Sequence, residues 1–347
     1  MSKCVWLVVG VALVSGCATF SALAPKRDEV LILSFFRDNG RDGIFLAWSE
    51  DGVNFKPLND DKPVMKPGPW QGQNLTRDPS MVYRDGKFHV VWTSSWGGKW
   101  FGCAESGDLK TWSDPVKVQP FPESLPQAEQ SVNVWAPEIC WDPVQKNYAV
   151  FWSSTTGRTS GHRIYVSRTT DLTTFTDAKM FFDQGFSCID GMMAFDPQGS
   201  FRARNGRWLL VLKNELEVKD GGKNLRLTTA PADFSKPWEP VSKPLAGPGS
   251  AVRGHEMAEG PSLLKWNGRW FLFWDAFAND HYCLATTTDL EKWPDRTAEL
   301  KLPPHPRHGT VFVAPRSAVA WLKTDRDAPP RTNSTTAHES NPGSPQS

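Results

Sequence analysis

The chain of 347 residues has few cysteines, almost no net charge and no apolar run long enough to cross a bilayer. Its six cysteines follow no spacing typical of a zinc site or a thioredoxin motif. A formal net charge of +1 provides no basic footprint, which argues against nucleic acid as a partner. The apolar stretch from Val5 to Val14 is too short to span a membrane comfortably.

The N-terminus has the form of an export signal. Lys3 precedes the apolar stretch, which ends in Val14-Ser15-Gly16-Cys17, the pattern of a bacterial lipoprotein signal. We therefore expect a signal peptide over residues 1–16, lipidation of Cys17 and a tether over 17–29. This predicts a protein anchored by lipid in the bacterial cell envelope, at the outer membrane or cell surface. The alternatives are an ordinary secretory signal or a membrane anchor.

A motif in which an aspartate leads into an aromatic residue recurs along the chain at a period of about 60 residues. Short apolar runs and Gly/Asn/Asp turns fill each period, as expected for a propeller blade of four antiparallel strands. The sequence therefore predicts one five-bladed β-propeller over residues 30–323, followed by a disordered tail over 324–347. The five copies begin at Asp51, Asp108, Asp171, Asp233 and Asp289 and end at Phe55, Trp112, Phe175, Trp238 and Trp293.

A second column aligns the segments that open each repeat. Since the first strand of every propeller blade is innermost, equivalent first residues converge on one mouth of the channel. Three carboxylates and a histidine are thereby expected to meet in space. The residues of this column are Asp78, Ala136, Asp190, Glu259 and His308.

Aromatic and β-branched runs predict the second strands of the blades. They begin at Lys87, Asn147, Arg207 and Arg269. The fifth blade has no such run after His308, so Val30–Phe36 and Gly43–Ser49 are predicted to complete it. The two ends of the chain would then close the ring in one blade.

The segments Arg77-Asp78-Pro79, Trp135-Ala136-Pro137-Glu138, Ile189-Asp190 and Glu259-Gly260-Pro261, with Arg307-His308-Gly309, resemble glycoside hydrolase family 43. That family consists of five-bladed propellers that cleave arabinofuranosides and xylosides. The resemblance implies that Asp78 is the general base, that Asp190 tunes the pKa of the acid and orients the sugar, and that Glu259 is the general acid. Asp190 precedes Gly191 where many members have proline, which leaves the sugar open.

Glycosidic hydrolysis needs one carboxylic acid to protonate the leaving group and one carboxylate to activate water. Carboxylates on separate blades suit an inverting pair, about 6.5–9.5 Å apart, better than a retaining pair. We expect an enzyme that releases arabinofuranose, xylose or a related sugar from plant or algal polysaccharides or oligosaccharides. The alternatives are a fructan-type propeller glycosidase and a carbohydrate-binding lipoprotein without turnover.

The side chains that are further predicted to contact the sugar are Trp96, Trp135, Glu138, Lys213, Glu215, Arg253 and His255. The alternative is that they belong to a solvated rim of the propeller. No cofactor is expected to be required. The resemblance implies a calcium ion in the channel, bound beside His308 through water. The alternative is that His308 is only hydrogen-bonded within the channel. We expect a monomer, and four cysteines that pack in the core without a catalytic role, namely Cys103, Cys140, Cys188 and Cys283.

Overall fold

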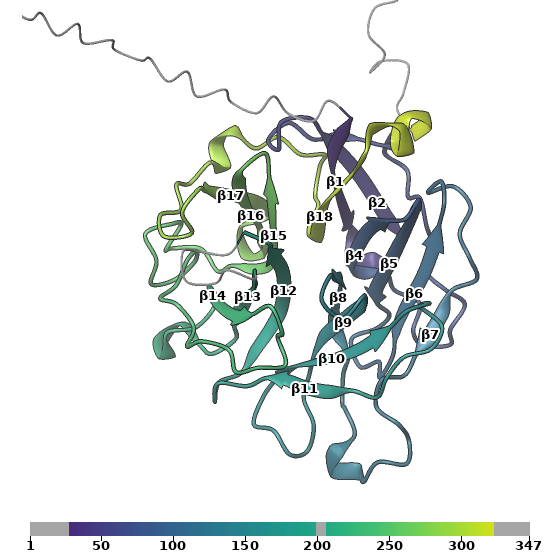
Figure 1. Cartoon of the computed structure of the whole chain (residues 1–347), viewed down its shortest axis with the longest axis vertical. Helices are drawn as coiled ribbons and strands as arrows, with labels where there is room; N and C mark the ends of the chain where they lie inside the picture. Colours follow the sequence, from purple (N-terminus) through teal and green to yellow (C-terminus); the bar gives the residue numbers. More distant parts are fainter. Residues whose placement is uncertain (1–27, 199–205, 323–347) are drawn as a thin grey trace, which may run out of the picture.

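A computed structural model describes residues 28–198 and 206–322, which form five antiparallel sheets arranged in a ring around one axis (Figure 1). The prediction of a five-bladed β-propeller is confirmed. The predicted leader, the lipidated cysteine and nearly all of the tether lie outside the described residues, as does the predicted tail.

The blades are numbered here in the chain order of their first strands. Blade 1 contains β4 (Arg77–Arg84), β5 (Lys87–Thr93), β6 (Phe101–Ser106) and β7 (Val116–Val118). Blade 2 contains β8 (Trp135–Asp142), β9 (Asn147–Ser154), β10 (Arg163–Thr169) and β11 (Lys179–Phe182). Blade 3 contains β12 (Cys188–Asp196), β13 (Arg207–Asn214) and β14 (Asn224–Pro231). Blade 4 contains β15 (Glu259–Trp266), β16 (Arg269–Ala276) and β17 (His281–Thr287).

Blade 5 joins the two ends of the chain, as predicted. It consists of β18 (Arg307–Pro315), β1 (Glu29–Phe36), β2 (Ile44–Ser49) and β3 (Lys56–Pro57). β1 pairs antiparallel with β18, with Val30 opposite Ala314 and Ser34 opposite Thr310. This pairing leaves the ring without an open edge between its first and last strands.

Short 3-10 helices lie in the connections between strands, and the described residues contain no α-helix. None of the helices found in this part of the chain has the length and apolar character needed to cross a bilayer. The 3-10 helices are η1 (Asp38–Gly40), η2 (Asn59–Asp61), η3 (Gln127–Glu129), η4 (Val218–Asp220), η5 (Phe277–Asn279), η6 (Thr297–Glu299) and η7 (Arg316–Leu322).

The first strand of each blade faces the axis. β4 contacts β8, β8 contacts β12, β12 contacts β15, β15 contacts β18, and β18 contacts β4, so the five strands line the channel in order. The residues that open these strands therefore gather at one mouth, although the chain separates them by a whole blade.

Blades 3 and 4 have three strands where four were expected. The segments that would form their outer strands make only isolated bridges, between Leu225 and Ala246 and between Ala285 and Asp295. Proline interrupts both segments, at Pro240, Pro244 and Pro248 and at Pro294. Because proline has no backbone donor, it cannot continue a ladder of hydrogen bonds.

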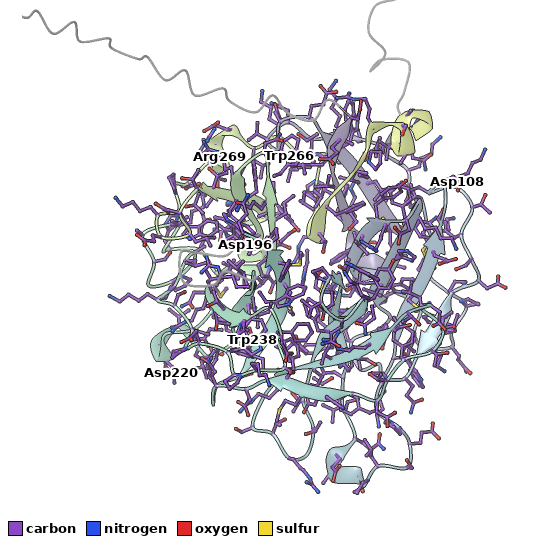
Figure 2. The ribbon with its side chains drawn as sticks, in the orientation of Figure 1. Asp108, Asp196, Asp220, Trp238, Trp266 and Arg269 are labelled. Atoms are coloured by element: carbon purple, nitrogen blue, oxygen red, sulfur yellow. The ribbon has the colours of Figure 1, made fainter. Side chains whose placement is uncertain are left out.

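The repeated aspartates form turns after the third strands. Asp108 Oδ1, for example, accepts hydrogen bonds from the backbone N–H groups of Lys110 and Thr111 at 2.9 and 2.7 Å. Asp51, Asp171 and Asp289 make the same pair of contacts with the residues that follow them. Figure 2 shows Asp108 at the outer rim of the ring. These aspartates therefore shape the blades and lie far from the axis.

The aromatic residues of the repeat pack between blades. Trp112 packs against the cluster shared by blades 5 and 1, Trp238 against that of blades 2 and 3, and Trp293 within that of blades 3 and 4. The cysteines behave as small core residues: Cys103, Cys188 and Cys283 are buried, Cys140 is half-buried, and none of the four forms a disulfide within the described residues.

Candidate active site

Each first strand begins with a local irregularity that turns its opening residues toward the mouth of the channel. In blades 1 to 4 the pairing register shifts across a four-residue segment near the start of the strand, for example from Arg77 to Ser80 in blade 1 and from Ile189 to Met192 in blade 3. The second residue of each shifted segment has a positive φ, a conformation that costs little for Gly and is uncommon for other residues. These residues are Asp78 at 50°, Ala136 at 48°, Asp190 at 54° and Gly260 at 55°.

The expected alignment of Glu259 with Asp78 is wrong by one residue. Glu259 pairs with Asp275 as the first residue of its strand, just as Arg77 pairs with Thr93. The position equivalent to Asp78 is Gly260, where a Cβ atom would lie 2.6 Å from the ring of His308. A side chain is therefore excluded there, and the carboxylate of blade 4 comes from the preceding residue.

The opening residues of the strands line one cavity of about 300 Å³. It brings together all three carboxylates that the sequence singled out, Asp78, Asp190 and Glu259. Five further predicted residues line the same cavity: Trp96, Trp135, Lys213, Glu215 and His308.

The floor of the cavity is a buried group of charges. His308 Nδ1 lies 3.4 Å from Asp78 Oδ1 and 4.0 Å from Asp190 Oδ2. Asp190 Oδ2 also accepts the backbone N–H of Gly260 at 3.1 Å. All three side chains are less than one tenth exposed, so their charges act on one another with little screening by water.

Burial shifts the pKa values of this group. Desolvation, together with the nearby carboxylates of Glu259 and Asp78, raises the pKa of Asp190 to about 6, although His308 and Lys213 oppose the shift. For His308 desolvation lowers the pKa, but Asp190, Asp78 and other carboxylates outweigh it, so its pKa is raised above the usual value. The floor can therefore exchange a proton near neutral pH.

Glu259 lies in a network with three cations and a second carboxylate. Lys213 Nζ donates to Glu259 Oε2 at 2.9 Å, and Arg307 Nη2 lies 3.6 Å from Glu259 Oε1. Lys213 also pairs with Glu215 at 2.9 Å, and Lys223 reaches Glu215 at 2.8 Å. Desolvation alone would lower the pKa of Lys213, but Glu259, Asp190 and Glu215 raise it, so this lysine is cationic.

Lys213 lies at the end of the second strand of its blade, a position at which other blades have a hydrogen-bond acceptor for the backbone of the next blade. At the corresponding end of the second strand, Thr93 and Ser153 accept the N–H of the positive-φ residue in the next blade, at 2.8 and 3.0 Å. Asp275 accepts the N–H of His308, the second residue of β18, at 3.2 Å. A lysine cannot accept this hydrogen bond. In blade 3 the N–H of Gly260 is instead received by Asp190, and Lys213 is available for Glu259.

Aromatic rings form one wall of the cavity. The side chain of Trp96 is 55% exposed, and its ring meets that of Trp135 edge to face at 6.1 Å. Trp135 Nε1 donates to the backbone oxygen of Trp96 at 2.7 Å, and His162 stacks on the Trp135 ring at 4.7 Å. Arg77 covers Trp96 with its guanidinium carbon 4.0 Å from the ring centre. Such preordered aromatic faces suit the apolar faces of sugar rings.

Three predicted sugar contacts lie elsewhere. Glu138 is buried below the cavity, where it accepts hydrogen bonds from Ser80 at 2.5 Å and Thr310 at 2.8 Å. Burial raises the pKa of Glu138 to about 7. Arg253 and His255 do not line the cavity, because the loop that contains them directs both toward Glu256. The prediction that Arg253 and His255 contact the sugar rested on their nearness to Glu259 in the sequence, and the structure does not place them at the cavity.

Several lining residues were not singled out as sugar contacts, among them Arg77, Thr93, Lys223 and Phe277. For Arg77 a signal existed, since it belongs to the Arg77-Asp78-Pro79 segment. Phe277 follows the second strand of blade 4 directly, as Glu215 follows that of blade 3. Lys223 and His162 each stand directly before the third strand of their blade, β14 (Asn224–Pro231) and β10 (Arg163–Thr169), but their side chains differ, so the repeat gave no chemical signal for them.

A calcium ion beside His308 stays a prediction, and the donor set suits it only in part. Carboxylate oxygens of the kind calcium prefers are present in Asp78 and Asp190. Nδ1 of His308 faces both carboxylates and the pKa of the ring is raised, which favours the protonated ring. A protonated ring cannot ligate a metal directly, so His308 fits only the predicted contact through water. No chemical step proposed below involves calcium.

The fold and the cavity define a class. Three carboxylates from three blades, an aromatic wall and a concave site at the axis of a five-bladed propeller form the arrangement of a carbohydrate-hydrolysing propeller. A family model described as "Probable glycosyl hydrolase domain", related to glycoside hydrolase family 43, matches residues 29–317, and the chain belongs to this family.

Comparison with solved structures finds one with the same fold at a TM-score above 0.5 and further similar ones below it. A thermostable family-43 glycoside hydrolase is 15% identical, with 69% of this chain and 82% of that chain covered at a TM-score of 0.52. A family-43 endo-arabinanase from Bacillus licheniformis is 17% identical, covering 67% and 78% at a TM-score of 0.47. An arabinanase from Bacillus subtilis is 17% identical, covering 69% and 80% at 0.48. No curated protein sequence matches the chain.

Proposed function

We propose that this protein is an inverting glycoside hydrolase that removes single arabinofuranose or xylose units from the ends of glycan chains. The observation that carries the proposal is the cavity at the axis, where Asp78, Asp190 and Glu259 from three different blades meet. Two carboxyl groups in distinct surroundings are what acid/base hydrolysis of a glycosidic bond requires.

Asp78 acts as the general base in this proposal. It removes a proton from the water that attacks the anomeric carbon, and its ion pair with His308 holds its carboxylate in place. Glu259 is the general acid, which delivers a proton to the departing oxygen on the opposite face of the sugar. Since the two residues come from blades 1 and 4, a sugar and a water molecule can lie between them.

Asp190 tunes the pKa of the acid and orients the sugar in this proposal. Its position next to His308 and to the backbone N–H of Gly260 links the base side of the cavity to the strand that bears the acid. Its negative charge opposes loss of a proton from a neighbouring carboxyl group. Lys213 donates to Glu259 Oε2 at 2.9 Å and so holds this carboxyl group in the cavity.

The size of the cavity favours a small terminal sugar. A volume of about 300 Å³ lies at the lower end of the range for ligand sites, which suits one monosaccharide better than a long chain segment. Trp96 and Trp135 at the mouth offer stacking surfaces for the next sugar unit.

A panel of aryl glycosides tests this proposal. The purified protein is expected to hydrolyse an arabinofuranoside or a xyloside, and Asp78→Asn is expected to abolish that activity without loss of fold. Galactosides and fructosides serve as comparison substrates. Binding of the matching oligosaccharide without turnover of any substrate would instead favour a carbohydrate-binding lipoprotein, and turnover of fructosides would favour the fructan-type alternative.

We further propose that the enzyme works at a membrane surface, anchored through Cys17. The support is the sequence Val14-Ser15-Gly16-Cys17 after a basic and apolar leader. Cys17→Ser should move the active protein from the membrane fraction to the soluble exported fraction. Wild-type protein found unlipidated and free in the medium would show an ordinary secretory signal.

A further inference from the structure

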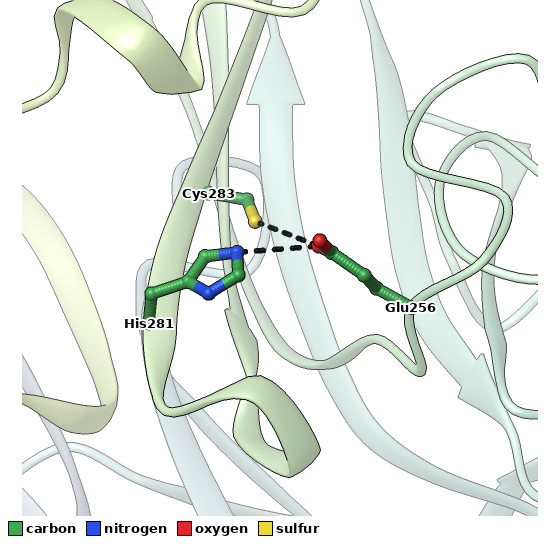
Figure 3. Close-up of side chains that lie close together, drawn as sticks. All are labelled: Glu256, His281 and Cys283. Carbon is green, nitrogen blue, oxygen red and sulfur yellow. Dashed lines mark hydrogen bonds and ion pairs between the residues drawn. The ribbon is translucent and has the colours of Figure 1, made fainter.

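A second group of reactive side chains lies in blade 4, outside the catalytic cavity (Figure 3). Glu256 comes from the loop before β15, and His281 and Cys283 come from β17. Because they are two residues apart on one strand, His281 and Cys283 point to the same side of the sheet. One potential ligand atom from each of the three side chains lies within 4.8 Å of the others.

Glu256 Oε2 is the centre of the group. It lies 3.2 Å from His281 Nε2 and 3.9 Å from Cys283 Sγ (Figure 3). Two nitrogen or oxygen ligands of a tetrahedral zinc ion, each about 2.0 Å from the metal, lie about 3.3 Å apart. A pair that includes a sulfur ligand lies slightly farther apart because the Zn–S bond is about 2.3 Å. The three atoms therefore need to move only a little to share one ion.

The ring of His281 has the orientation that metal ligation needs. Its Nδ1 lies 3.1 Å from the backbone oxygen of Asn279 and must carry the proton in that hydrogen bond. Nε2 therefore presents a lone pair toward Glu256, and Arg253 Nη2 donates to it at 3.2 Å. Histidine ligands in metal sites are commonly oriented by a hydrogen bond from the ring nitrogen that does not bind the metal, as Nδ1 of His281 makes with Asn279.

Two acceptor atoms and a thiol converge at this place, an arrangement that favours a cation. Arg253 provides a positive charge there, with two hydrogen bonds of 2.6 Å to Glu256. The guanidinium also lies 3.4 Å from Asp295, which can retain it when an ion enters. His255, which is largely exposed and lies 3.3 Å from Glu256 Oε1, can supply a fourth ligand.

Cys103 in the third strand of blade 1 provides a comparison. It is buried, as Cys283 is, but its thiol donates to the backbone oxygen of Leu172. The position equivalent to Cys283, which lies opposite Trp274, is Gly102, which lies opposite Trp92. The group around Glu256 therefore has no counterpart in blade 1, and Cys103 is a buried thiol outside any such group.

We propose that Glu256, His281 and Cys283 bind a zinc ion, with His255 or water as the fourth ligand. Zinc accepts this mixed set of oxygen, nitrogen and sulfur donors. Binding replaces the proton of the Cys283 thiol, which is released to solvent. The ion would fix the loop at Glu256, three residues before Glu259, so its role is to hold the start of the strand that bears the catalytic acid.

Cobalt is the probe, since cobalt bound to a thiolate gives a charge-transfer absorption in the near ultraviolet. The full chain, freed of metal with a chelator, is titrated with Co²⁺ and then with Zn²⁺. We expect the absorption to grow to one cobalt per chain and to disappear when zinc displaces cobalt. Its absence from the wild-type protein would overturn the proposal.

Variants locate the site. Cys283→Ser and His281→Gln should each lose the absorption, whereas Cys103→Ser should keep it. His281→Gln is included because its partly exposed position lets the fold survive even if Cys283→Ser unfolds. Persistence of the absorption in a folded His281→Gln or Cys283→Ser protein would overturn the assignment. The readout is independent of glycosidase activity.

Discussion

Blades 1 and 4 deliver a carboxylate to the same cavity by different backbone routes. In blade 1 the carboxylate belongs to Asp78, the second residue of the strand, which has a positive φ. In blade 4 that position is Gly260, packed against the ring of His308, and the carboxylate belongs to the preceding Glu259. The longer side chain of glutamate suits the shift of one residue.

The difference separates the two carboxylates chemically. Asp78 is buried on the floor and faces His308, while Glu259 lies near the rim and faces Lys213 and Arg307. A general base and a general acid need unlike surroundings, because one must be ionised when the other is protonated. Two routes into one cavity provide such surroundings on a repeated scaffold.

The largest effect is expected from removing either carboxylate. Asp78→Asn should lower kcat by about 10²- to 10⁴-fold on every substrate, because each turnover needs activated water. Glu259→Gln should cause a similar loss on glycans with poor leaving groups but should spare much of the activity on activated aryl glycosides. Steady-state kinetics with a series of leaving groups measures the contrast.

Glu215→Gln is the matched control for Glu259→Gln. Both residues pair with Lys213 at 2.9 Å, but only Glu259 is assigned a proton transfer. We expect Glu215→Gln to lose far less kcat on natural glycan. Equal losses in the two variants, or near-normal turnover of natural glycan by Glu259→Gln, would remove the assignment of the acid.

A substitution at Gly260 should break the blade 4 route. In Gly260→Ala the new Cβ would meet the His308 ring at 2.6 Å, at a φ of 55° that alanine rarely adopts. We expect a loss of about 1–3 kcal/mol in the free energy of unfolding and a fall in kcat of up to about 10²-fold, because His308 and Glu259 are displaced. Gly107→Ala, with open space around its Cβ, should change neither.

Asp190, which links the base Asp78 to the strand of the acid Glu259, should appear in the pH profile. Its pKa is raised to about 6 and its ionised form is required, so kcat/KM should fall as pH drops below about 6, which forms the acidic limb of the profile. Lys213 lowers the pKa of Asp190. Lys213→Met should therefore move this acidic limb to higher pH. A limb that moves to lower pH, or stays in place, would contradict the coupling.

The smallest effect is expected at the aromatic wall. Trp96→Ala should raise KM by about two- to tenfold with little change in kcat, since a stacking contact is worth about 0.5–1.5 kcal/mol. Trp100, in the same loop, lies outside the cavity with its ring over Lys117 and its Nε1 bonded to Gln119. Trp100→Ala should leave KM unchanged. Equal changes in both variants would point to general loosening of the loop.

Much of the fold was predictable because the repeat has a physical cause. Each aspartate at its start caps a turn through its side-chain oxygen, and the aromatic residue after it packs between blades. The predicted starts of the second strands are confirmed, since β5, β9, β13 and β16 begin at Lys87, Asn147, Arg207 and Arg269. The missing outer strands of blades 3 and 4 were not, although Pro294 and the prolines before β15 indicated them.

The site was predictable only where side chains repeat with the blades. Asp78 and Asp190 occupy the same position of the repeat. The correct position of Glu259 follows from aligning Pro261 with Pro79 and Pro137, which places Gly260 opposite Asp78 in the alignment and Glu259 one residue earlier. Arg253 and His255 were misplaced because sequence proximity to Glu259 says nothing about which way a loop turns. The group around Glu256 joins a loop to a distant hairpin, and no spacing rule in the sequence indicates it.

The stereochemistry of the product tests the central claim most directly. If Asp78 activates water on the face opposite to the acid Glu259, the first sugar released has the inverted anomeric configuration. Proton NMR of the reaction mixture in its first minutes, before the anomers equilibrate, distinguishes the two products. The account predicts the inverted anomer. The retained anomer would mean that a carboxylate attacks the sugar itself, which would contradict the role of Asp78 as a base.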